Sequence, residues 1–482
     1  MSRDLRCAVI GAGMAGILSA MKLPASGITD FTVYEKGDGV GGTWRENTYP
    51  GLSCDVPSHL YSFSFEPSAE WSHHFAPGNQ IRKYLEDIAE RQGILDRTRF
   101  NDAVTSCRYS EGKWHITTAS GHTDEADVVI AATGVLHHPK YPDIEGLDTF
   151  EGPTFHSALW DHEAKLEGAR VGIIGTGSTA VQITSAIVQD VAHLSLFQRT
   201  AQWVMSVENP PYSEDEITSF RAQPDSLTDL RRQQSEFFDI FATAVVDSDS
   251  DEMKLLEQVC IANLESRVGD PDLREKLRPD YRPACKRLVI SPNFYEAIQH
   301  PNAELVTDAI DHVEKRGVVT KDGRLHELDV LVLATGFHVD AFMRPMEIIG
   351  RNGVTLEEAW TPRPVAYLSI SIPEFPNLFM INGPNGPVGN FSLIEVAELQ
   401  LGYILQLIDR IRSDRAAEIC ATSDALAEFE VAREEASKQT VWVTGCRSWY
   451  LDDRGIPAVW PWSFARFREV MKTPDLSSYD LR

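Results

Sequence analysis

The apolar positions of this chain repeat one order of structural elements twice. Residues 7–23 and 170–187 each begin with a short apolar run typical of a buried strand, pass through a glycine-rich turn and continue with small or apolar residues at helical spacing. Further along each half, residues 106–134 and 309–336 indicate a hairpin followed by a buried strand that ends in a Thr-Gly turn. This order predicts an α/β fold with two Rossmann-like, doubly wound units.

Other segments interrupt this repeat. Residues 36–101 are rich in Gly, Pro, Ser and aromatic residues and are interpreted as an extended loop region. The C-terminal part of the chain indicates one long helix at 392–411, followed by an aromatic-rich tail. Residues 135–150 and 337–345 are predicted to link the two units.

The domain organisation follows from this order, and a length of 482 residues is consistent with several domains. The first unit is expected to comprise residues 1–140 and 378–482, and the second unit residues 146–205 and 284–340. A polar and mostly helical insertion is predicted for residues 206–283. Its acidic run DSDSDE is interpreted as a solvated loop.

The charge of the chain restricts its partners. A formal net charge of −26 argues against binding to nucleic acid or to an anionic membrane, since both require basic surfaces. No apolar run approaches the roughly 20 residues of a membrane span. The sequence MSRDLR leads directly into the first strand and leaves no room for a secretory signal. We therefore expect a cytoplasmic protein, monomeric or homodimeric, without a nucleic-acid or membrane partner.

The cysteine pattern indicates no metal or dithiol chemistry. The seven cysteines are an odd number and contain no Cys-x-x-Cys pair. Their absence from such a pair argues against a dithiol reductase and against a thiolate zinc site. Reduced thiols are therefore the expectation for all seven, and no bound metal is expected.

The first glycine turn predicts a dinucleotide site. Gly11 allows the tight turn, Gly13 lets the backbone approach a pyrophosphate, and Gly16 lets the following helix pack against the strand. The helix N-terminus attracts the phosphates. Glu35 follows at the distance where a carboxylate accepts hydrogen bonds from ribose hydroxyls, which predicts a nucleotide with a free 2′-hydroxyl.

The second glycine turn predicts NADPH. Gly175, Gly177 and Ala180 repeat the pattern, and Arg199 occupies the position equivalent to Glu35. A guanidinium at this place can bind a 2′-phosphate, which a carboxylate would repel, and Thr200 can add a hydroxyl donor. The other polar residues of this turn are also expected to contact the cofactor: Thr176, Ser178 and Thr179.

Two dinucleotide sites in one chain imply that one cofactor is a flavin. An NAD in the first unit would leave no acceptor for the hydride of NADPH, so FAD is expected there. The loop at residues 41–65 offers the planar and polar groups that an isoalloxazine ring requires. The expected FAD contacts in this loop are Thr43, Trp44, Asp55 and Tyr61.

The segment between the two units resembles a motif of a known family. Residues 150–161, FEGPTFHSALWD, match the fingerprint F-x-G-x-x-x-H-x-x-x-W-[PD] of type I Baeyer–Villiger monooxygenases. The matching residues are Phe150, Gly152, His156, Trp160 and Asp161. They lie between the two nucleotide units, as the family requires, and the resemblance implies an interdomain role for the histidine.

The resemblance covers nearly the whole chain and implies further site residues. The loop at 41–65 is similar to the flavin loop of the family, and Val104 is expected beside the adenine. The segment ACKRLVISPNFYE is similar to the active-site loop, which implies Lys286 near the 2′-phosphate and Arg287 at the flavin. GCRSWY resembles the mobile loop whose tryptophan contacts NADP, here Trp449. NGPNGPVGNFSLI resembles the loop that lines the substrate side of the flavin.

Two departures from the family pattern bear on substrate range and loop closure. Ser53 replaces the arginine that often precedes the Cys-Asp pair. The segment LDDRGIPAVWPWSF, which follows the mobile loop, lacks the Gly-x-Asn-x-Pro-Gly-Lys pattern of the best-known members.

The resemblance implies a defined reaction. NADPH reduces FAD, the reduced flavin binds O2 as a C4a-peroxyflavin, and this peroxide inserts one oxygen atom next to the carbonyl of a small-molecule ketone to give an ester or lactone. Arg287, oriented by Asp55, is the expected catalytic cation, since an arginine stabilises the peroxide anion without supplying a proton. Two alternatives remain at this stage: an N- or S-oxygenating flavin monooxygenase, and a non-catalytic redox sensor. The Trp160-Asp161 pair and Arg287 argue against the first.

Overall fold

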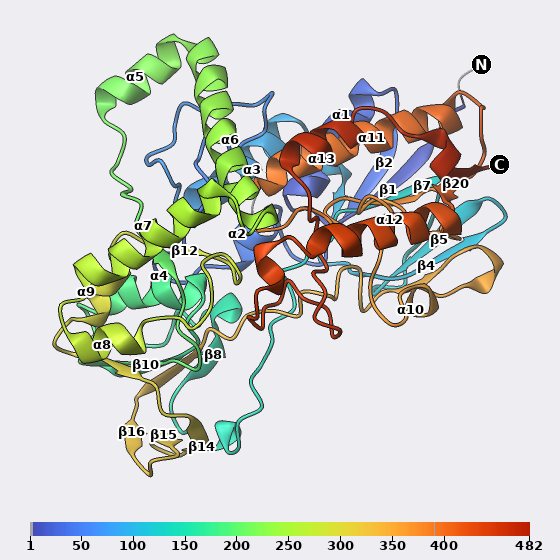
Figure 1. The fold of residues 1–482 in the computed structure, drawn as a ribbon. Helices are drawn as coiled ribbons and strands as arrows, with labels where there is room; N and C mark the ends of the chain where they lie inside the picture. The colour runs from blue at the N-terminus through green and yellow to red at the C-terminus, as the bar shows by residue number, and fades with distance from the viewer. Residues whose placement is uncertain (1–2, 390) are drawn as a thin grey trace.

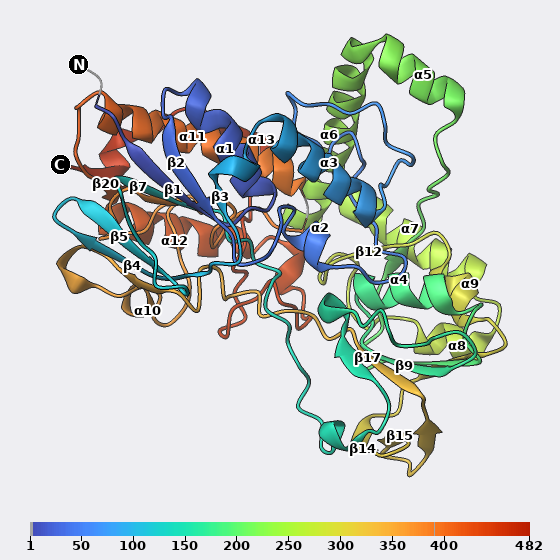
Figure 2. The ribbon, with the colours of Figure 1, turned by 180° about the vertical axis from the view of Figure 1, so that it is seen from behind.

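The computed structural model describes residues 3–389 and 391–482 and contains two α/β units joined by two linkers (Figure 1). The linkers run beside one another, because Lys140 N donates to Gly336 O at 2.9 Å and His338 N donates to His138 O at 2.9 Å. The first and last residues that the structure describes both lie at the end of the first unit that is far from the second unit (Figures 1 and 2). The predicted pair of Rossmann-like units is confirmed.

A five-stranded parallel sheet forms the centre of the first unit, in the order β19-β7-β1-β2-β3. Its strands are β1 (Arg6–Ile10), β2 (Asp30–Tyr34), β3 (Thr98–Arg99), β7 (Val128–Ala131) and β19 (Leu378–Met380). Helices on one face of this sheet are α1 (Met14–Ala25), α3 (Gly78–Arg91) and α11 (Leu393–Arg412). Cys7 and Val9 of β1 pack in the core beneath these helices, whereas Ala8 and Ile10 face the opposite side.

A second, smaller sheet covers that opposite side in the order β18-β4-β5-β6. Its strands are β4 (Val104–Ser110), β5 (Lys113–Thr118), β6 (Thr123–Ala126) and β18 (Glu347–Ile349). The predicted hairpin at 106–121 is confirmed by the antiparallel pairing of β4 with β5. The segment at 346–377, which follows the predicted second linker and has no assignment from the sequence, contributes β18 and α10 (Leu356–Ala359) to this side.

The second unit repeats the architecture with a parallel sheet in the order β13-β10-β9-β17-β8. Its strands are β8 (Thr154–His156), β9 (Arg170–Ile174), β10 (His193–Phe197), β13 (Ala303–Val306) and β17 (Val330–Leu333). Helices α4 (Ser178–Ile187) and α9 (Phe294–Ile298) pack together in the core of this unit. The predicted hairpin at 309–324 is also confirmed, as part of β14 (Ile310–Glu314), β15 (Gly317–Thr320) and β16 (Leu325–Glu327).

The insertion is helical, as predicted. It contains α5 (Glu214–Ala222), α6 (Pro224–Val246), α7 (Asp251–Arg267) and α8 (Pro271–Lys276), and it is framed by the short paired strands β11 (Val204–Met205) and β12 (Val289–Ile290). Helix α5 stands away from the body of the molecule, and α6 runs back between the two units (Figure 1). Apolar residues of α6 enter the cores of both units, since Ala242 belongs to the first core and Ala244 to the second.

Two expectations about secondary structure were wrong. Residues 36–101 are not only loop, because they contain α2 (Thr43–Glu46) and the long α3, whose Ile81, Leu85 and Ile88 are buried at helical spacing. The C-terminal part has more than one helix. It adds α12 (Ser423–Ser437), α13 (Phe464–Val470) and the antiparallel pair β20 (Ile419–Ala421) and β21 (Tyr479–Leu481).

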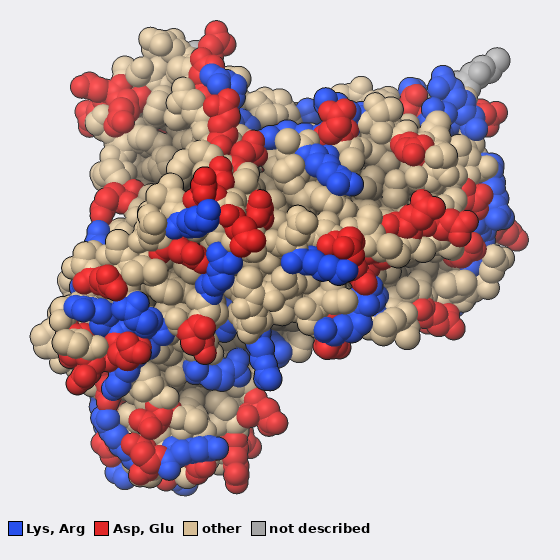
Figure 3. Space-filling view, in the orientation of Figure 1, with Lys and Arg blue, Asp and Glu red and all other residues tan. Residues whose placement is uncertain are grey.

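Short 3₁₀ turns complete the chain. They are η1 (Leu95–Arg97), η2 (Leu147–Thr149), η3 (Ser157–Leu159), η4 (Arg351–Gly353), η5 (Val441–Val443) and η6 (Leu476–Ser478). None of the helices in the described part of the chain combines the length and apolarity needed to cross a lipid bilayer. Acidic and basic side chains are interspersed over the face shown in Figure 3.

Candidate active site

The first glycine turn joins β1 to α1 and is closed by backbone contacts. Gly11 has a φ of +104°, and a methyl group built on it would lie 2.5 Å from the carbonyl oxygen of Ala132. A methyl group on Gly16 would lie 1.8 Å from the carbonyl oxygen of Gly11, so the helix can approach the strand only without a side chain there. Gly13 lies against Gly42, which brings the flavin loop to the start of α1.

Glu35 lies at the end of β2, beside this turn. Its buried carboxylate accepts hydrogen bonds from Ala12 N at 2.7 Å and Gly37 N at 2.8 Å. The carboxylate is therefore fixed at the carboxyl edge of the sheet, where a dinucleotide ribose lies in this fold. The turn and the carboxylate together fit the adenosine and pyrophosphate groups of FAD.

The second glycine turn joins β9 to α4 and leaves more space. Gly175 has a φ of +124°, and a methyl group on it would lie 2.3 Å from the carbonyl oxygen of Ala334. A methyl group on Gly177 would have no atom of the described residues within 4 Å beyond its own chain neighbours. Thr176 donates its hydroxyl to the carbonyl oxygen of Thr200 at 2.8 Å, which ties the turn to the end of the next strand. The open space over Gly177 fits a pyrophosphate.

The start of α4 also contacts the flavin loop of the first unit. Ser178 is the first residue of α4, and the Thr179 hydroxyl donates to the Tyr49 hydroxyl at 3.4 Å. Gln182, one turn further along, accepts from the Tyr49 hydroxyl at 3.0 Å and donates to the carbonyl oxygen of Ser53 at 3.0 Å. The serine that departs from the family pattern thus lies at a hydrogen-bonded contact between the two units.

Two cations lie at the place predicted for a 2′-phosphate. Arg199 follows β10, is exposed and forms no ion pair with a residue that the structure describes. Lys286 lies with its Nζ 4.8 Å from the ring centroid of Tyr281. Burial and then the positive charge of Arg199 lower the pKa of Lys286, so the two cations repel one another across a shared space. An anionic group between them would relieve this repulsion.

The aromatic residues of the flavin loop contact one another. Thr43 begins α2, and Trp44 donates its indole N–H to the Tyr61 hydroxyl at 3.2 Å, with the two rings edge to face at 5.6 Å. Burial raises the pKa of Tyr61. Val104 lies apart from them, buried at the start of β4 in the core between the two sheets of the first unit.

The structure brings Arg287 and Asp55 together. Arg287 Nη2 donates to both carboxylate oxygens of Asp55, at 2.8 Å and 2.6 Å, and the carboxylate raises the pKa of the guanidinium. The arginine side chain remains 35% exposed, so its other nitrogens can meet a ligand. Burial raises the pKa of the neighbouring Tyr450 to about 12, and the Arg287 charge opposes this rise. The Trp449 and Tyr450 rings contact one another at a tilt of 37° with centroids 4.1 Å apart, and Trp449 is 37% exposed.

His156 of the fingerprint lies beside the start of the second linker. Its Nε2 lies 3.0 Å from the carbonyl oxygen of Gly336, at the end of the strand that precedes the second linker. Its Nδ1 accepts a hydrogen bond from Ala158 N at 3.1 Å, which leaves the proton on Nε2. Burial lowers the pKa of this histidine and favours the neutral ring. The arrangement fits a residue that positions a linker.

The other fingerprint residues pack or form hydrogen bonds within the second unit. Phe150 is buried in the core beside β17, and a methyl group on Gly152 would lie 2.3 Å from the carbonyl oxygen of Asp329. Trp160 packs against the core of the second unit, and Asp161 accepts a hydrogen bond at the start of the following turn. The fingerprint residues thus pack around β8, and none of them belongs to the Arg287–Asp55 ion pair.

The expectation of seven reduced thiols was wrong. Cys285 and Cys446 form a disulfide, while Cys7, Cys54, Cys107, Cys260 and Cys420 are free and buried. A pair separated by 161 positions leaves no local spacing signal, which is why a search for Cys-x-x-Cys did not find it. Among the described residues, no group of three or more His, Cys, Asp or Glu side chains is arranged to hold a metal ion.

Two residues near the proposed cofactor sites, Tyr450 and Gln182, were not identified from the sequence. Tyr450 stands next to Trp449 in the motif GCRSWY, and this adjacency could have marked it. Gln182 carries no such signal, since an exposed or half-buried glutamine on a helix is ordinary. In the loop expected to line the substrate side of the flavin, Asn390 lies outside the described residues.

Comparisons with known proteins agree with this geometry. The family described as flavin-binding monooxygenase-like matches residues 4–234. An uncharacterized monooxygenase of Mycobacterium tuberculosis is 48% identical over 98% of this chain and 96% of the relative. A Baeyer–Villiger monooxygenase of Streptomyces coelicolor is 41% identical over 99% of this chain and 92% of the relative. The chain belongs to the Baeyer–Villiger monooxygenase family. The predicted family and the prediction of a flavin-binding monooxygenase are thereby confirmed.

The solved structures support the Baeyer–Villiger monooxygenase fold over the whole chain. The crystal structure of cyclohexanone monooxygenase from Rhodococcus sp. Phi1 bound to NADP+ matches with a TM-score of 0.88 and 31% identity, and it covers 100% of both chains. That structure holds NADP+ in a protein of the same architecture as the two units described here. Membership of the monooxygenase family sets aside the alternative of a non-catalytic redox sensor.

Proposed function

We propose that this protein is an NADPH- and O2-dependent Baeyer–Villiger monooxygenase that converts a ketone into an ester or lactone. The balanced reaction consumes one ketone, one O2, one NADPH and one proton, and it yields the ester, NADP+ and water. The observation that carries the proposal is the Arg287–Asp55 ion pair, which is partly exposed and joins the two units that carry the dinucleotide turns. Family membership makes FAD and NADP(H) the cofactors.

The first unit, predicted as residues 1–140 and 378–482 and extended by β18 and α10, is assigned to FAD. Glu35 and the turn at Gly11, Gly13 and Gly16 would hold the adenosine and pyrophosphate. Thr43, Trp44, Asp55 and Tyr61 would surround the flavin ring, with Val104 towards the adenine. When bound, FAD supplies hydride acceptance and the activation of O2.

The second unit, residues 146–205 and 284–340, is assigned to NADP(H), with the insertion at 206–283 beside it. The open space over Gly177 would receive the pyrophosphate at the N-terminus of α4. Arg199 and Lys286 would bind the 2′-phosphate, and their repulsion in its absence supports this assignment. Trp449 would close over the nucleotide from the C-terminal segment.

Arg287 is the group that supports oxygen transfer. It is held by Asp55 and remains protonated at any physiological pH, so it stabilises negative charge without releasing a proton. A lysine would lack both the fork geometry and the permanent charge. Asp55 orients the guanidinium by accepting two hydrogen bonds from one nitrogen and leaves its other nitrogens available.

A ketone panel with product analysis tests the proposal. Cyclic, aryl and long-chain ketones are incubated with the FAD-loaded enzyme and NADPH, and a thioether and a tertiary amine serve as comparison substrates. We expect an ester or lactone from at least one ketone. Sulfoxide or N-oxide formation with no ester from any ketone would assign the protein to heteroatom oxidation instead.

A further inference from the structure

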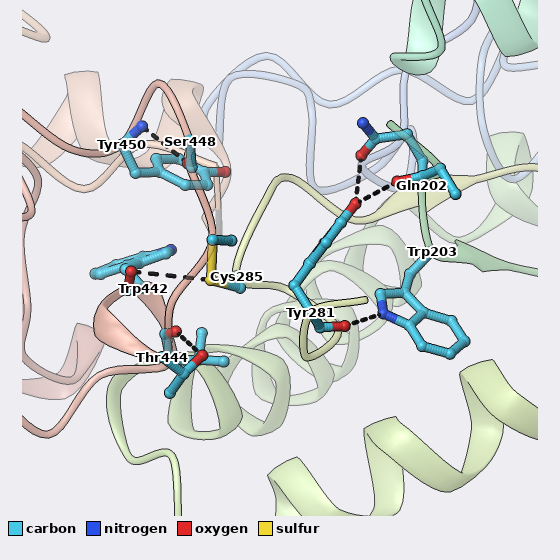
Figure 4. The surroundings of a disulfide bond; sticks show 11 residues. Gln202, Trp203, Tyr281, Cys285, Trp442, Thr444, Ser448 and Tyr450 are labelled. Atoms are coloured by element: carbon cyan, nitrogen blue, oxygen red, sulfur yellow. Dashed lines mark hydrogen bonds between the residues drawn. A yellow bond between two sulfur atoms is a disulfide. The ribbon is translucent and has the colours of Figure 1, made fainter. Parts of the chain in front are cut away.

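The Cys285–Cys446 disulfide joins two segments that carry site residues. Cys285 lies in the segment between α8 and β12, and Cys446 follows η5 near the C-terminus. Arg287 comes two positions after the first cysteine, and Trp449 comes three positions after the second. In Figure 4 the bond runs from Cys285 into the C-terminal segment that carries Trp442, Thr444, Ser448 and Tyr450, with Tyr281 on the other side.

The C-terminal segment at 443–449 has few other attachments. Among the described residues, the hydrogen bonds of this segment join partners within three positions, such as Thr444 N to Val441 O at 3.1 Å and Tyr450 N to Ser448 Oγ at 3.1 Å. Five of its seven residues are exposed. Local hydrogen bonds hold the shape of such a segment but do not hold it against another element. The disulfide therefore supplies the long-range attachment.

We propose that the Cys285–Cys446 disulfide is a positioning element that keeps the segment at 443–449, with Trp449, in place against the Lys286–Arg287 loop, and that a dithiol releases it. This inference rests on the proposed function. Release requires two electrons and two protons, which a dithiol supplies as it becomes a disulfide, leaving two cysteine thiols in the protein. Separation of the two segments then weakens NADP(H) binding and lets NADPH oxidation proceed without ester formation.

The burial of the cysteine sulfurs favours reaction of a dithiol with the disulfide over reactions of the free thiols. Cys285 is fully buried and Cys446 is only 7% exposed, but Cys446 lies between the exposed Gly445 and Arg447, so this is the side from which a reductant can approach the bond. The five free cysteines are buried, and burial raises the pKa of the Cys420 thiol to about 11. A neutral buried thiol reacts slowly with oxidants and disulfides. Thiol–disulfide exchange in the folded protein is thus confined to this one pair.

Thiol counting comes first in the test. The protein purified without reductant is denatured, alkylated and weighed by mass spectrometry, with and without prior reduction. We expect five alkylated cysteines without reduction and seven after it, with the missing two in one cross-linked peptide pair containing residues 285 and 446. Seven reactive thiols in the unreduced sample would overturn the proposal.

The functional part compares oxidised enzyme, enzyme treated with dithiothreitol and the double variant Cys285→Ser/Cys446→Ser, all loaded with FAD. We expect reduction to raise the dissociation constant for NADP+ and the KM for NADPH at least fivefold, to lower ester per NADPH at least threefold, and to leave FAD content unchanged. Reoxidation should restore the wild type but not the variant. The variant should be insensitive to dithiothreitol.

The outcomes separate this inference from the proposed function. If the oxidised enzyme makes no ester from any ketone, the proposed function fails, but the NADP+ dissociation constant still tests the positioning role. If reduced and oxidised enzyme bind NADP+ equally and give equal ester per NADPH, the bond has no positioning role. Loss of FAD on reduction without recovery on reoxidation would show a purely structural bond and would also overturn the inference.

Discussion

Arg287 donates two hydrogen bonds to the Asp55 carboxylate across 232 positions of the chain. Asp55 belongs to the loop of the first unit, and Arg287 belongs to the segment that leads into β12 of the second. The ion pair therefore joins the unit assigned to FAD with the unit assigned to NADP(H). The distances between the guanidinium and the carboxylate therefore depend on the relative position of the two units.

Replacement of Arg287 should separate cofactor reduction from oxygen transfer. In Arg287→Ala we expect retained FAD, continued oxidation of some NADPH, release of hydrogen peroxide and a fall in ester formation of about 10²- to 10³-fold, the usual effect of losing one charge-stabilising group. The measurement is ester formed per NADPH consumed, with peroxide determined in parallel.

Further variants at Arg287, Asp55 and Arg282 serve as controls for the Arg287→Ala result. Arg287→Lys should not restore the ester yield, and Asp55→Asn should show a milder form of the same defect because it frees the arginine without removing it. Arg282→Ala is a matched control, since Arg282 lies in the same segment but pairs with Glu257. A near-normal ester yield in Arg287→Ala would rule out this arginine as the stabilising cation.

Arg199 should set the preference for NADPH. Hydrogen bonds to a charged group contribute about 1.5–3 kcal/mol, so Arg199→Ala should lower kcat/KM for NADPH by about 10- to 150-fold. The value for NADH should change little because NADH has no 2′-phosphate. The exposed Arg316 of the same unit offers a control, and Arg316→Ala should leave both values unchanged. Equal losses with both nucleotides in Arg199→Ala would assign the arginine to the fold.

The pH dependence of NADPH use should report Lys286. Burial and Arg199 lower the pKa of this lysine, so in the free enzyme it loses its charge at a lower pH than an ordinary lysine, whose pKa is about 10.4. The affinity for the 2′-phosphate should then fall as pH rises through the lowered pKa. A profile of log kcat/KM for NADPH, which reports the free enzyme, should show this alkaline fall.

Two variants identify the group responsible for that fall. Arg199→Ala removes a repelling charge, so it should move the fall to higher pH. Lys286→Met removes the titrating group, so the fall should disappear. An unchanged alkaline limb in Lys286→Met, measured where FAD stays bound, would assign the titration to another residue.

Gly177→Ala should affect binding but not folding. The added methyl group meets open space in the protein, so the melting temperature should change by no more than about 2 °C. The same methyl group would overlap a pyrophosphate, and overlap costs about 1–3 kcal/mol, or roughly a 5- to 150-fold higher KM for NADPH. Gly175→Ala is the contrasting variant, because its methyl group would meet the Ala334 carbonyl oxygen and should destabilise the unit. An unchanged KM in Gly177→Ala would place the pyrophosphate elsewhere.

The sequence predicted those parts of the fold that follow from local chemistry. The strand, glycine turn and helix of each unit follow from apolar periodicity and from positions such as Gly11 and Gly175, where the backbone leaves no alternative residue. The position of Glu35 at the end of β2 follows from the same repeat, and the structure places its carboxylate beside the turn. The insertion was recognised because its polar helices lack any strand signal.

Other features could not be derived locally. Helix α3 has apolar residues at helical spacing, but glycine, proline and serine around it dominated the interpretation of residues 36–101. The attachment of β18 to β4 and the disulfide between Cys285 and Cys446 both depend on chain segments far apart in sequence. Such contacts are fixed by the packing of whole units, and no short window of sequence contains them.

The origin of the inserted oxygen atom tests the proposed Baeyer–Villiger reaction. The FAD-loaded enzyme is supplied with NADPH, an accepted ketone and 18O2 in unlabelled water, and the ester or lactone is analysed by mass spectrometry. We expect one 18O atom per product molecule, in the bridging ester oxygen, and one product molecule for each NADPH consumed. An unlabelled product, or NADPH consumption that yields only hydrogen peroxide with every ketone tested, would contradict it.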